Sequence, residues 1–350
     1  MPMRLIRPFL VAAIALLPAC DSGESNFDPL VTNEAAAAVV GALQQSPAFQ
    51  TLDVMGDKIV FTAPSGIVAA ALPGALFPRA PFATWARERA AGPDVRAPEA
   101  PAAPIFPADL LGKTLTYNVA LGRYEISAQT GAPSNGVRFI LYEVDLVQRA
   151  IKQPLAPVGH LDLTDESTPA AAILRLVVVI NNATLLDYQA SASFTTSSIG
   201  FSAEGVVSDG ETSVEFELTQ RISAGPTITV NYLLAVPEND VSLSLDATAT
   251  GSGLTVTLTI QDGGNTTAVQ VTETAQGVTG TVTHNGRVVI TISGTSEDPI
   301  FTDVNGNPLT QAQLDALEAL SDMIEQLFDA FDDLLGPAHR LLDFPWLEPA

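Results

Sequence analysis

Side chains that carry most enzyme chemistry are few and scattered in this 350-residue sequence. Its histidines, His160, His284 and His339, lie far apart, and its single cysteine is Cys20. One cysteine excludes a disulfide framework and a cysteine-based zinc site. The sequence has no G-x-S-x-G, G-x-x-x-x-G-K-[ST], G-x-G-x-x-G or H-E-x-x-H pattern. We therefore expect no catalytic residues, no cofactor and no metal site, with an unrecognised hydrolase as the third-ranked interpretation.

A partial calcium motif occurs near the end of the chain. Asp303, Asn305 and Asn307 match the first three oxygen-ligand positions of an EF-hand loop. Position six is Pro308 where glycine is needed, and position twelve is Leu314 where a bidentate glutamate is needed. We interpret the segment as a turn between a strand and a helix. Weak, nonspecific binding of divalent ions to the acidic surface stays open.

The N-terminus has the pattern of a secretory signal. Arg4 and Arg7 precede the apolar run of residues 8–17, which is too short to cross a bilayer as a helix. The order Leu17-Pro18-Ala19-Cys20 resembles the lipobox of bacterial lipoproteins. This resemblance implies cleavage between Ala19 and Cys20, with Cys20 as the acylated N-terminus of the mature chain. An ordinary signal cut near Ala19 is the alternative, although Leu17 fits the small-x-small rule poorly.

Lipidation at Cys20 would attach the protein to a membrane through acyl chains alone, because several buried chains exceed what stable anchoring needs. We therefore expect a partner membrane and a place in the bacterial cell envelope. Asp21 follows the cysteine, but the leaflet and the choice of inner or outer membrane stay open. Residues 22–26 are polar and suit a tether.

The composition indicates a soluble, acidic, folded domain. Hydrophobic residues make up 47% of the chain, and the formal net charge is -23 from 39 acidic and 16 basic residues. A charge of this sign repels nucleic acid and anionic headgroups, so we expect no nucleic-acid partner. Residues 153–350 hold 26 of the acidic residues and only four basic ones, so the excess belongs to the second half.

Between the tether and residue 110, the sequence predicts a helix and a strand followed by a linker. An alanine-rich helix is predicted over residues 35–45, capped by residues 32–34 and ended by Ser46-Pro47, and a strand over residues 58–62. Residues 73–108 hold eight prolines and predict an irregular linker or surface crossing.

From residue 114 the hydrophobic period is two. Val214, Phe216 and Leu218 alternate with polar residues, and the runs that begin at Leu254 and at Val288 do the same. Turn signals at residues 181–182, 209–210, 251–253, 262–264 and 285–286 separate the runs, which predicts an antiparallel up-and-down meander. The run 173–180 is apolar at nearly every position, so we expect cover on both of its faces. The outward positions are polar and lack aromatic girdles, which argues against a membrane barrel.

A long amphipathic helix is predicted at the C-terminus. Thr310 and Gln313 form a capping box, and Gly336-Pro337 ends the helix. Leucine and phenylalanine residues form one stripe, and the opposite face carries only acidic charges, so the helix needs an apolar surface to pack on. The dry face of the meander is the expected surface.

We expect a mainly β (α+β) protein, an open sheet or half-barrel packed against the C-terminal helix. The leading hypothesis is a noncatalytic envelope lipoprotein that acts as a binding or structural module for a protein partner. The alternative is a carrier of lipid or another hydrophobic ligand in a half-barrel cavity, an analogy of architecture alone. The expected segments are 1–19 signal peptide, 20–32 acylated N-terminus and tether, 33–72 helix and strand, 73–110 linker, 111–308 β domain, 309–336 C-terminal helix and 337–350 tail.

Overall fold

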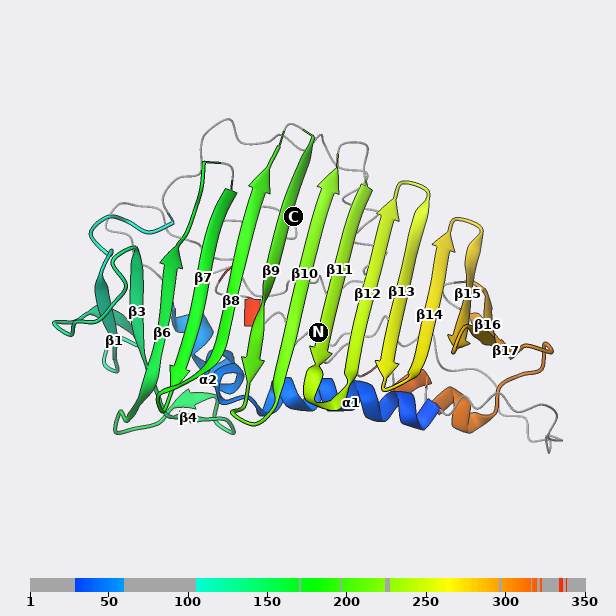
Figure 1. Ribbon diagram of the computed structural model, residues 1–350, viewed down its shortest axis with the longest axis horizontal. Helices are drawn as coiled ribbons and strands as arrows, with labels where there is room; N and C mark the ends of the chain where they lie inside the picture. The colour runs from blue at the N-terminus through cyan, green and yellow to red at the C-terminus, as the bar shows by residue number, and fades with distance from the viewer. Residues whose placement is uncertain are drawn as a thin grey trace.

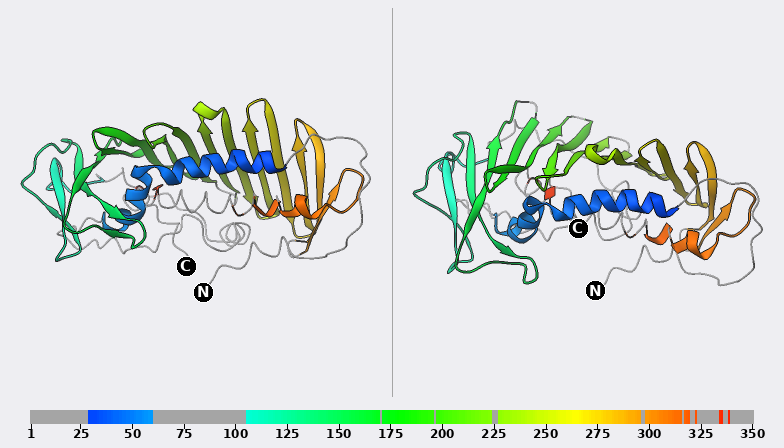
Figure 2. Two further views of the ribbon diagram at one scale, coloured as in Figure 1. Left: turned by 90° about the horizontal axis from the view of Figure 1, so that it is seen from below. Right: turned by 60° about the horizontal axis from the view of Figure 1, so that its bottom comes forward.

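The computed structural model of the protein describes residues 29–59, 105–169, 171–195, 197–223, 227–295, 298–315, 317–319, 322, 334–335 and 338. Over these residues the fold is mainly β. A single sheet of 15 strands has the order β17-β16-β15-β14-β13-β12-β11-β10-β9-β8-β7-β6-β3-β1-β2, and helices lie against one of its faces (Figures 1 and 2). The expectation of a mainly β protein is confirmed.

The large sheet begins with the strands β1 (Lys113–Asn118), β2 (Arg123–Ile126), β3 (Gly136–Tyr142), β6 (Pro157–Asp165) and β7 (Ala171–Ile180). It continues with β8 (Ala183–Phe194), β9 (Ser198–Ser208), β10 (Ser213–Ser223), β11 (Thr227–Val236), β12 (Val241–Thr250) and β13 (Gly253–Asp262). The last strands are β14 (Asn265–Thr274), β15 (Gly277–His284), β16 (Arg287–Gly294) and β17 (Pro299–Asp303). A separate hairpin is formed by β4 (Val144–Asp145) and β5 (Ala150–Ile151).

From β6 to β17 the strands follow one another in space as in sequence, each antiparallel to the next. The predicted turns are found, and Asn181, Asn182 and Asn285 adopt the positive φ angles that asparagine tolerates in tight hairpins. At about 4.8 Å per strand the sheet is about 67 Å wide. The edge strands β2 and β17 do not pair with each other, so the sheet is open.

The meander does not extend to the first strands, where the prediction of a purely antiparallel sheet is wrong. β1 pairs with β3 in parallel, with Leu115 opposite Phe139, and β2 completes the edge antiparallel to β1. β1 and β3 are joined through the β2 hairpin and the loop after it, which is long enough for a parallel return.

The two faces of the sheet differ. The covered face carries Leu176, Tyr188, Phe216, Tyr232 and Leu258, each at most 4% exposed. The open face carries the alternate residues, such as Glu215 and Glu217 beside Phe216. The alternation predicted for β10 is therefore confirmed, and the apolar core lies along the covered face.

Two predicted strands differ in detail. In β7 only one face is buried, and Ile173, Val177 and Val179 on the other are half-buried, so the expected cover on both faces is not found. In β16 the expected stripe of Val288, Ile290 and Ile292 is broken. A β-bulge between Val282 and Thr283 shifts the pairing, so Val288 is 44% exposed and Val289 is buried.

Two helices cross the covered face. α1 (Pro29–Gln45) lies against β9 to β13, and α2 (Pro47–Met55) against β7 to β9 and the β4–β5 hairpin. The predicted stop at Ser46-Pro47 ends α1, but the same proline opens α2, because proline fits the first turn of a helix. The 3₁₀ turn η2 (Gly56–Lys58) follows, so Lys58 does not begin the predicted strand, and residues 60–62 lie outside the described residues. A second 3₁₀ turn, η3 (Pro237–Asn239), joins β11 to β12.

The continuous C-terminal helix predicted over 309–336 is not shown. Described residues are helical at 311–315, 317–319, 322, 334–335 and 338, and the positions between lie outside the described residues. The capping box is present, because Gln313 Oε1 accepts hydrogen bonds from the Thr310 N–H and hydroxyl at 3.0 Å.

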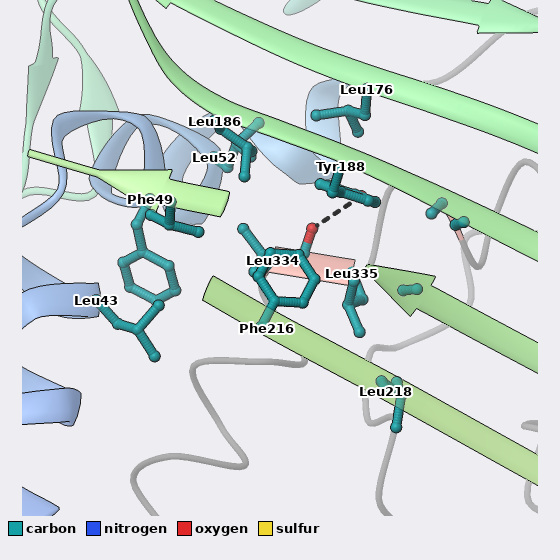
Figure 3. Packing of buried hydrophobic residues seen from close by; sticks show 14 of the residues in the cluster. Leu43, Phe49, Leu52, Leu176, Leu186, Tyr188, Phe216, Leu218, Leu334 and Leu335 are labelled. Carbon is teal, nitrogen blue, oxygen red and sulfur yellow. Dashed lines mark hydrogen bonds between the residues drawn. The ribbon is translucent and has the colours of Figure 1, made fainter. Parts of the chain in front are cut away.

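The last described residues pack on the centre of the covered face. Leu334 and Leu335 are at most 1% exposed, and the Tyr188 hydroxyl donates a hydrogen bond to the Leu334 carbonyl at 3.1 Å (Figure 3). Tyr188 meets the Phe216 ring edge to face, with 5.8 Å between the ring centroids. Gly205 lies opposite both aromatic residues, and a Cβ there would approach the Tyr188 Cβ to 2.3 Å. Glycine at this position gives the two rings room to meet.

Candidate binding surface

The open face is the face of the sheet that α1 and α2 leave uncovered. Its charged residues lie mainly on β3 to β10, and its hydroxyl-bearing residues mainly on β12 to β15. Because consecutive strands are in register, these side chains form rows across the sheet. A surface of this kind can offer many hydrogen bonds to a partner.

Two ion pairs bridge neighbouring strands of the open face. Arg138 on β3 contacts Asp162 on β6 through Nε–Oδ1 at 2.6 Å and Nη2–Oδ2 at 2.7 Å. Arg175 on β7 contacts Asp187 on β8 in the same bidentate way, at 2.9 and 2.7 Å. Both guanidinium groups are occupied by these carboxylates, and their pKa values are raised by the hydrogen bonds they donate to Asp162 and Asp187. These pairs fix side chains on the sheet.

His160 lies beside the first ion pair. Its Nε2 is 3.8 Å from Asp162 Oδ2. The pKa of His160 is lowered, first by partial burial and then by the nearby Arg138 charge, while Asp162 opposes the shift. The imidazole is therefore neutral near pH 7, and the carboxylate next to it is already held by arginine.

Threonines dominate the open face from β12 to β15. Thr248, Thr255, Thr272 and Thr279 stand opposite one another on four successive strands. The hydroxyls of Thr255 and Thr272 are 3.3 Å apart. Threonine favours strands, and its hydroxyl can be solvated. A row of threonines on an uncovered face therefore does not by itself indicate a specific ligand.

On the open face of β9 and β10, three acidic residues outnumber the basic Arg221. Glu217 on β10 stands directly opposite Glu204 on β9, and Glu215 is on the same face of β10. Like charges opposite each other on neighbouring strands are destabilising. This part of the sheet would favour a partner that brings positive charge.

The sequence singled out few candidate residues, and the structure does not bring them together. His160 is on the open face of β6, and His284 ends β15, where its Nδ1 lies 3.0 Å from the hydroxyl of the buried Thr267. Eight strands separate β6 from β15, a distance of about 43 Å. His339, Ala19 and Cys20 lie outside the described residues.

The partial calcium motif forms a turn. The Asp303 carboxylate accepts hydrogen bonds from the N–H groups of Asn305 and Asn307 at 2.8 Å and from the Asn307 amide at 2.9 Å. These hydrogen bonds lower the pKa of Asp303, with the Asn307 side chain as the main cause. Its oxygens are thus engaged within the turn that leads to Thr310, which agrees with the preferred interpretation.

The sequence did not reveal the two arginine–aspartate pairs. Their only signal is opposite charge on adjacent strands, and this becomes a pair only once the register is known. Within the described ranges, no group of three or more histidine, cysteine or acidic residues is placed to hold a metal ion. No helix among the described residues is long and apolar enough to cross a membrane.

Comparisons with known proteins found no match. No protein-family model matches the chain, and neither curated proteins nor solved structures gave a match. The functional argument therefore rests on the residues and their arrangement.

Proposed function

We propose that this chain is a noncatalytic lipoprotein of the bacterial cell envelope, anchored by an acylated Cys20, whose open face binds a macromolecular partner. The observation that carries the binding role is the asymmetry of the sheet. One face is buried by the protein's own residues, whereas the other, on a sheet about 67 Å wide, carries the charged and hydroxyl-bearing side chains described above. Surfaces of this size are sufficient for a stable protein interface. The lipobox pattern supports the anchor.

The carrier of lipid or another hydrophobic ligand is the alternative, and the burial pattern favours it less. Most covered-face residues on β7 to β13 are buried, and Leu176, Leu218, Leu234 and Leu243 are at most 3% exposed. Side chains this inaccessible are in contact with protein atoms, whereas a carrier needs an apolar cavity beyond what its own side chains fill. Organic extraction of the purified protein tests this alternative, because a carrier should release bound lipid.

The C-terminal helix over 309–336 stays part of the proposal. Leu309 and Leu317 pack with Val282 and Ile290 on β15 and β16, whereas Leu334 contacts Tyr188 on β8. Seven strand spacings, about 34 Å, separate β15 from β8. The 17 residues from Leu317 to Leu334 would span about 26 Å as a helix, and the side chains at each end supply the rest. These contacts support a helix that crosses the covered face.

Site-specific photo-crosslinking tests the binding role. A photoreactive residue at Gln270, exposed on the open face of β14, should give a partner adduct in cells that produce the protein. Gln276 is the matched control, because it is also exposed but lies in the turn at the end of the same strand. Equal adducts at both positions, or none at Gln270, would contradict a partner on the open face.

An unrecognised envelope hydrolase is the third candidate. Of the described residues, His160 and His284 are too far apart to share a site, and His160 stands beside a carboxylate held by Arg138. Neither arrangement favours a catalytic role.

A further inference from the structure

We propose that one corner of the sheet, formed by the β1–β2 turn and the β4–β5 turn, contacts the lipid surface in which the protein is anchored. This inference rests on the proposed lipidation of Cys20 for its setting, but its own basis is the arrangement of exposed apolar side chains. We call this corner the apolar corner and define it by Val119, Leu121, Leu146 and Val147.

The four side chains are unusually exposed for their type. Val119 is 50% exposed, Leu121 54%, Leu146 46% and Val147 95%. In each turn a side chain accepts hydrogen bonds from two backbone N–H groups. Asn118 Oδ1 accepts from the N–H groups of Ala120 and Leu121 at 3.0 and 3.3 Å, and Asp145 Oδ1 accepts from those of Val147 and Gln148 at 3.0 and 2.9 Å. A turn whose N–H groups are already bonded loses less on leaving water for the membrane interface.

The two turns lie at the same end of the sheet. β1 and β3 run parallel with Leu115 opposite Phe139, so the end of β1 at Asn118 is level with the end of β3 at Tyr142. The β4–β5 hairpin follows directly from Tyr142 and is held to α2 by an Arg149–Asp53 ion pair at 2.6 Å. Both turns therefore project from this end (Figure 1).

α1 follows the tether, and its N-terminal end lies toward β13, away from the apolar corner, because α2 at its other end contacts β7 to β9. The junction of α1 and α2 is tied to the last residue of β9, because the Ser46 hydroxyl donates to the Ser208 carbonyl at 2.8 Å. β9 runs in the same direction as β3, since β6, β7 and β8 alternate between them. Cys20 precedes Pro29, the start of α1, by nine positions, a reach of about 30 Å. A tether this short keeps the whole domain close to the bilayer, so weak apolar contacts of the corner suffice.

The charges distinguish this corner from the rest of that end. Arg123, Arg149 and Lys152 each lie within 3.5 Å of a carboxylate, that of Glu125, Asp53 and Glu143 respectively. These three pairs cancel, and Asp145 leaves the corner with about one negative charge in a chain of net charge -23. The turns after β9, β11 and β13 at the same end carry instead the acidic residues Asp209, Glu211, Glu238, Asp240 and Asp262. An anionic bilayer would repel these turns more than the less charged, apolar corner. Apolar tips that project from ion-paired surroundings fit a lipid surface rather than a protein groove.

Single-cysteine labelling tests this contact on the full mature protein. In acylated protein the Cys20 sulfur is blocked, so an introduced cysteine is the only free thiol. An environment-sensitive fluorophore is attached at Val147→Cys or Leu121→Cys, and the protein is reconstituted in vesicles of phosphatidylethanolamine and phosphatidylglycerol. We expect a blue shift and quenching by bromolipids at both positions, and neither effect without vesicles.

Two control positions set the specificity. Val304→Cys replaces another exposed valine at the same end, in the turn after β17, and Ser252→Cys lies in a turn at the opposite end. Both labels should stay in a water-like environment. A water-like signal at Val147→Cys, or equal shifts at Val147→Cys and Val304→Cys, would overturn the apolar corner.

A second measurement separates this inference from the anchor. The mass of the N-terminal peptide shows whether Cys20 is acylated. Vesicle sedimentation of the unacylated Cys20→Ser chain measures membrane binding by the apolar corner without the anchor. Val147→Asp should lower vesicle partitioning of the unacylated chain about tenfold, whereas Val304→Asp should not. If the two variants partition equally, the membrane contact of the apolar corner is refuted, and the proposed anchor is not affected. If the natural chain is not acylated at Cys20, the anchor is refuted, and the partitioning of the two variants still tests the membrane contact of the corner.

Discussion

Replacing Tyr188 with phenylalanine should loosen the C-terminal residues from the covered face. Tyr188 is 1% exposed, and its hydroxyl donates to the carbonyl of Leu334, which is equally buried. Removal of the hydroxyl deletes one buried hydrogen bond and leaves that carbonyl without this donor, which costs about 1–2 kcal/mol. The ring contact with Phe216 should survive, because the phenyl ring is unchanged. We therefore expect the free energy of unfolding in urea to fall by about 1–2 kcal/mol.

Tyr124→Phe is the matched control for this prediction. Its hydroxyl also donates to a backbone carbonyl, that of the half-buried Ile140 at 2.7 Å, but from the edge strand β2. Both variants should lose a similar amount of stability. Only Tyr188→Phe should speed amide hydrogen exchange in peptides that contain residues 334–338. Unchanged exchange there in Tyr188→Phe, or the same acceleration in Tyr124→Phe, would refute the docking of the C-terminal residues on Tyr188.

Three further predictions follow from individual side chains. The Thr114 hydroxyl is buried and has no hydrogen-bond partner among the described residues, so Thr114→Val should raise the free energy of unfolding by about 1 kcal/mol in urea denaturation, and a loss would contradict this. Because the pKa of His160 is lowered below 6.5 in the folded state, the unfolded chain binds a proton more readily, and stability should fall as pH drops through about 6.5. His160→Gln should flatten that part of the thermal stability profile, and an unchanged slope would show that other groups cause it. A double-mutant cycle on the half-exposed Arg175–Asp187 pair should give a coupling of about 0.2–1 kcal/mol that weakens in high salt, and a salt-independent value would contradict its solvent-exposed setting.

The sheet was predictable from the sequence where one face is buried and the turns are marked. The alternation of Val214, Phe216 and Leu218 with acidic residues fixes which side of β10 is buried, and asparagine and glycine mark most hairpins. Neighbouring strands in such a meander then follow from short connections. The same local signals did not show α2, because Ser46-Pro47 both ends one helix and begins the next.

Features that depend on register or on distant contacts were not predictable. The bulge at Val282 exposes Val288, although the apolar run looks regular in sequence. The parallel β1–β3 pair and the Arg175–Asp187 pair arise only when strands are placed side by side. The candidate binding surface has the same origin, because polar residues scattered over many strands form rows only in the assembled sheet.

The most direct test of the lipoprotein proposal is mass spectrometry of the N-terminal peptide from protein extracted from the envelope of a bacterium that produces it. The account predicts a mature chain that begins at Cys20 and carries acyl groups on that residue. A mature N-terminus at any other position, or a Cys20 with a free thiol, would contradict it.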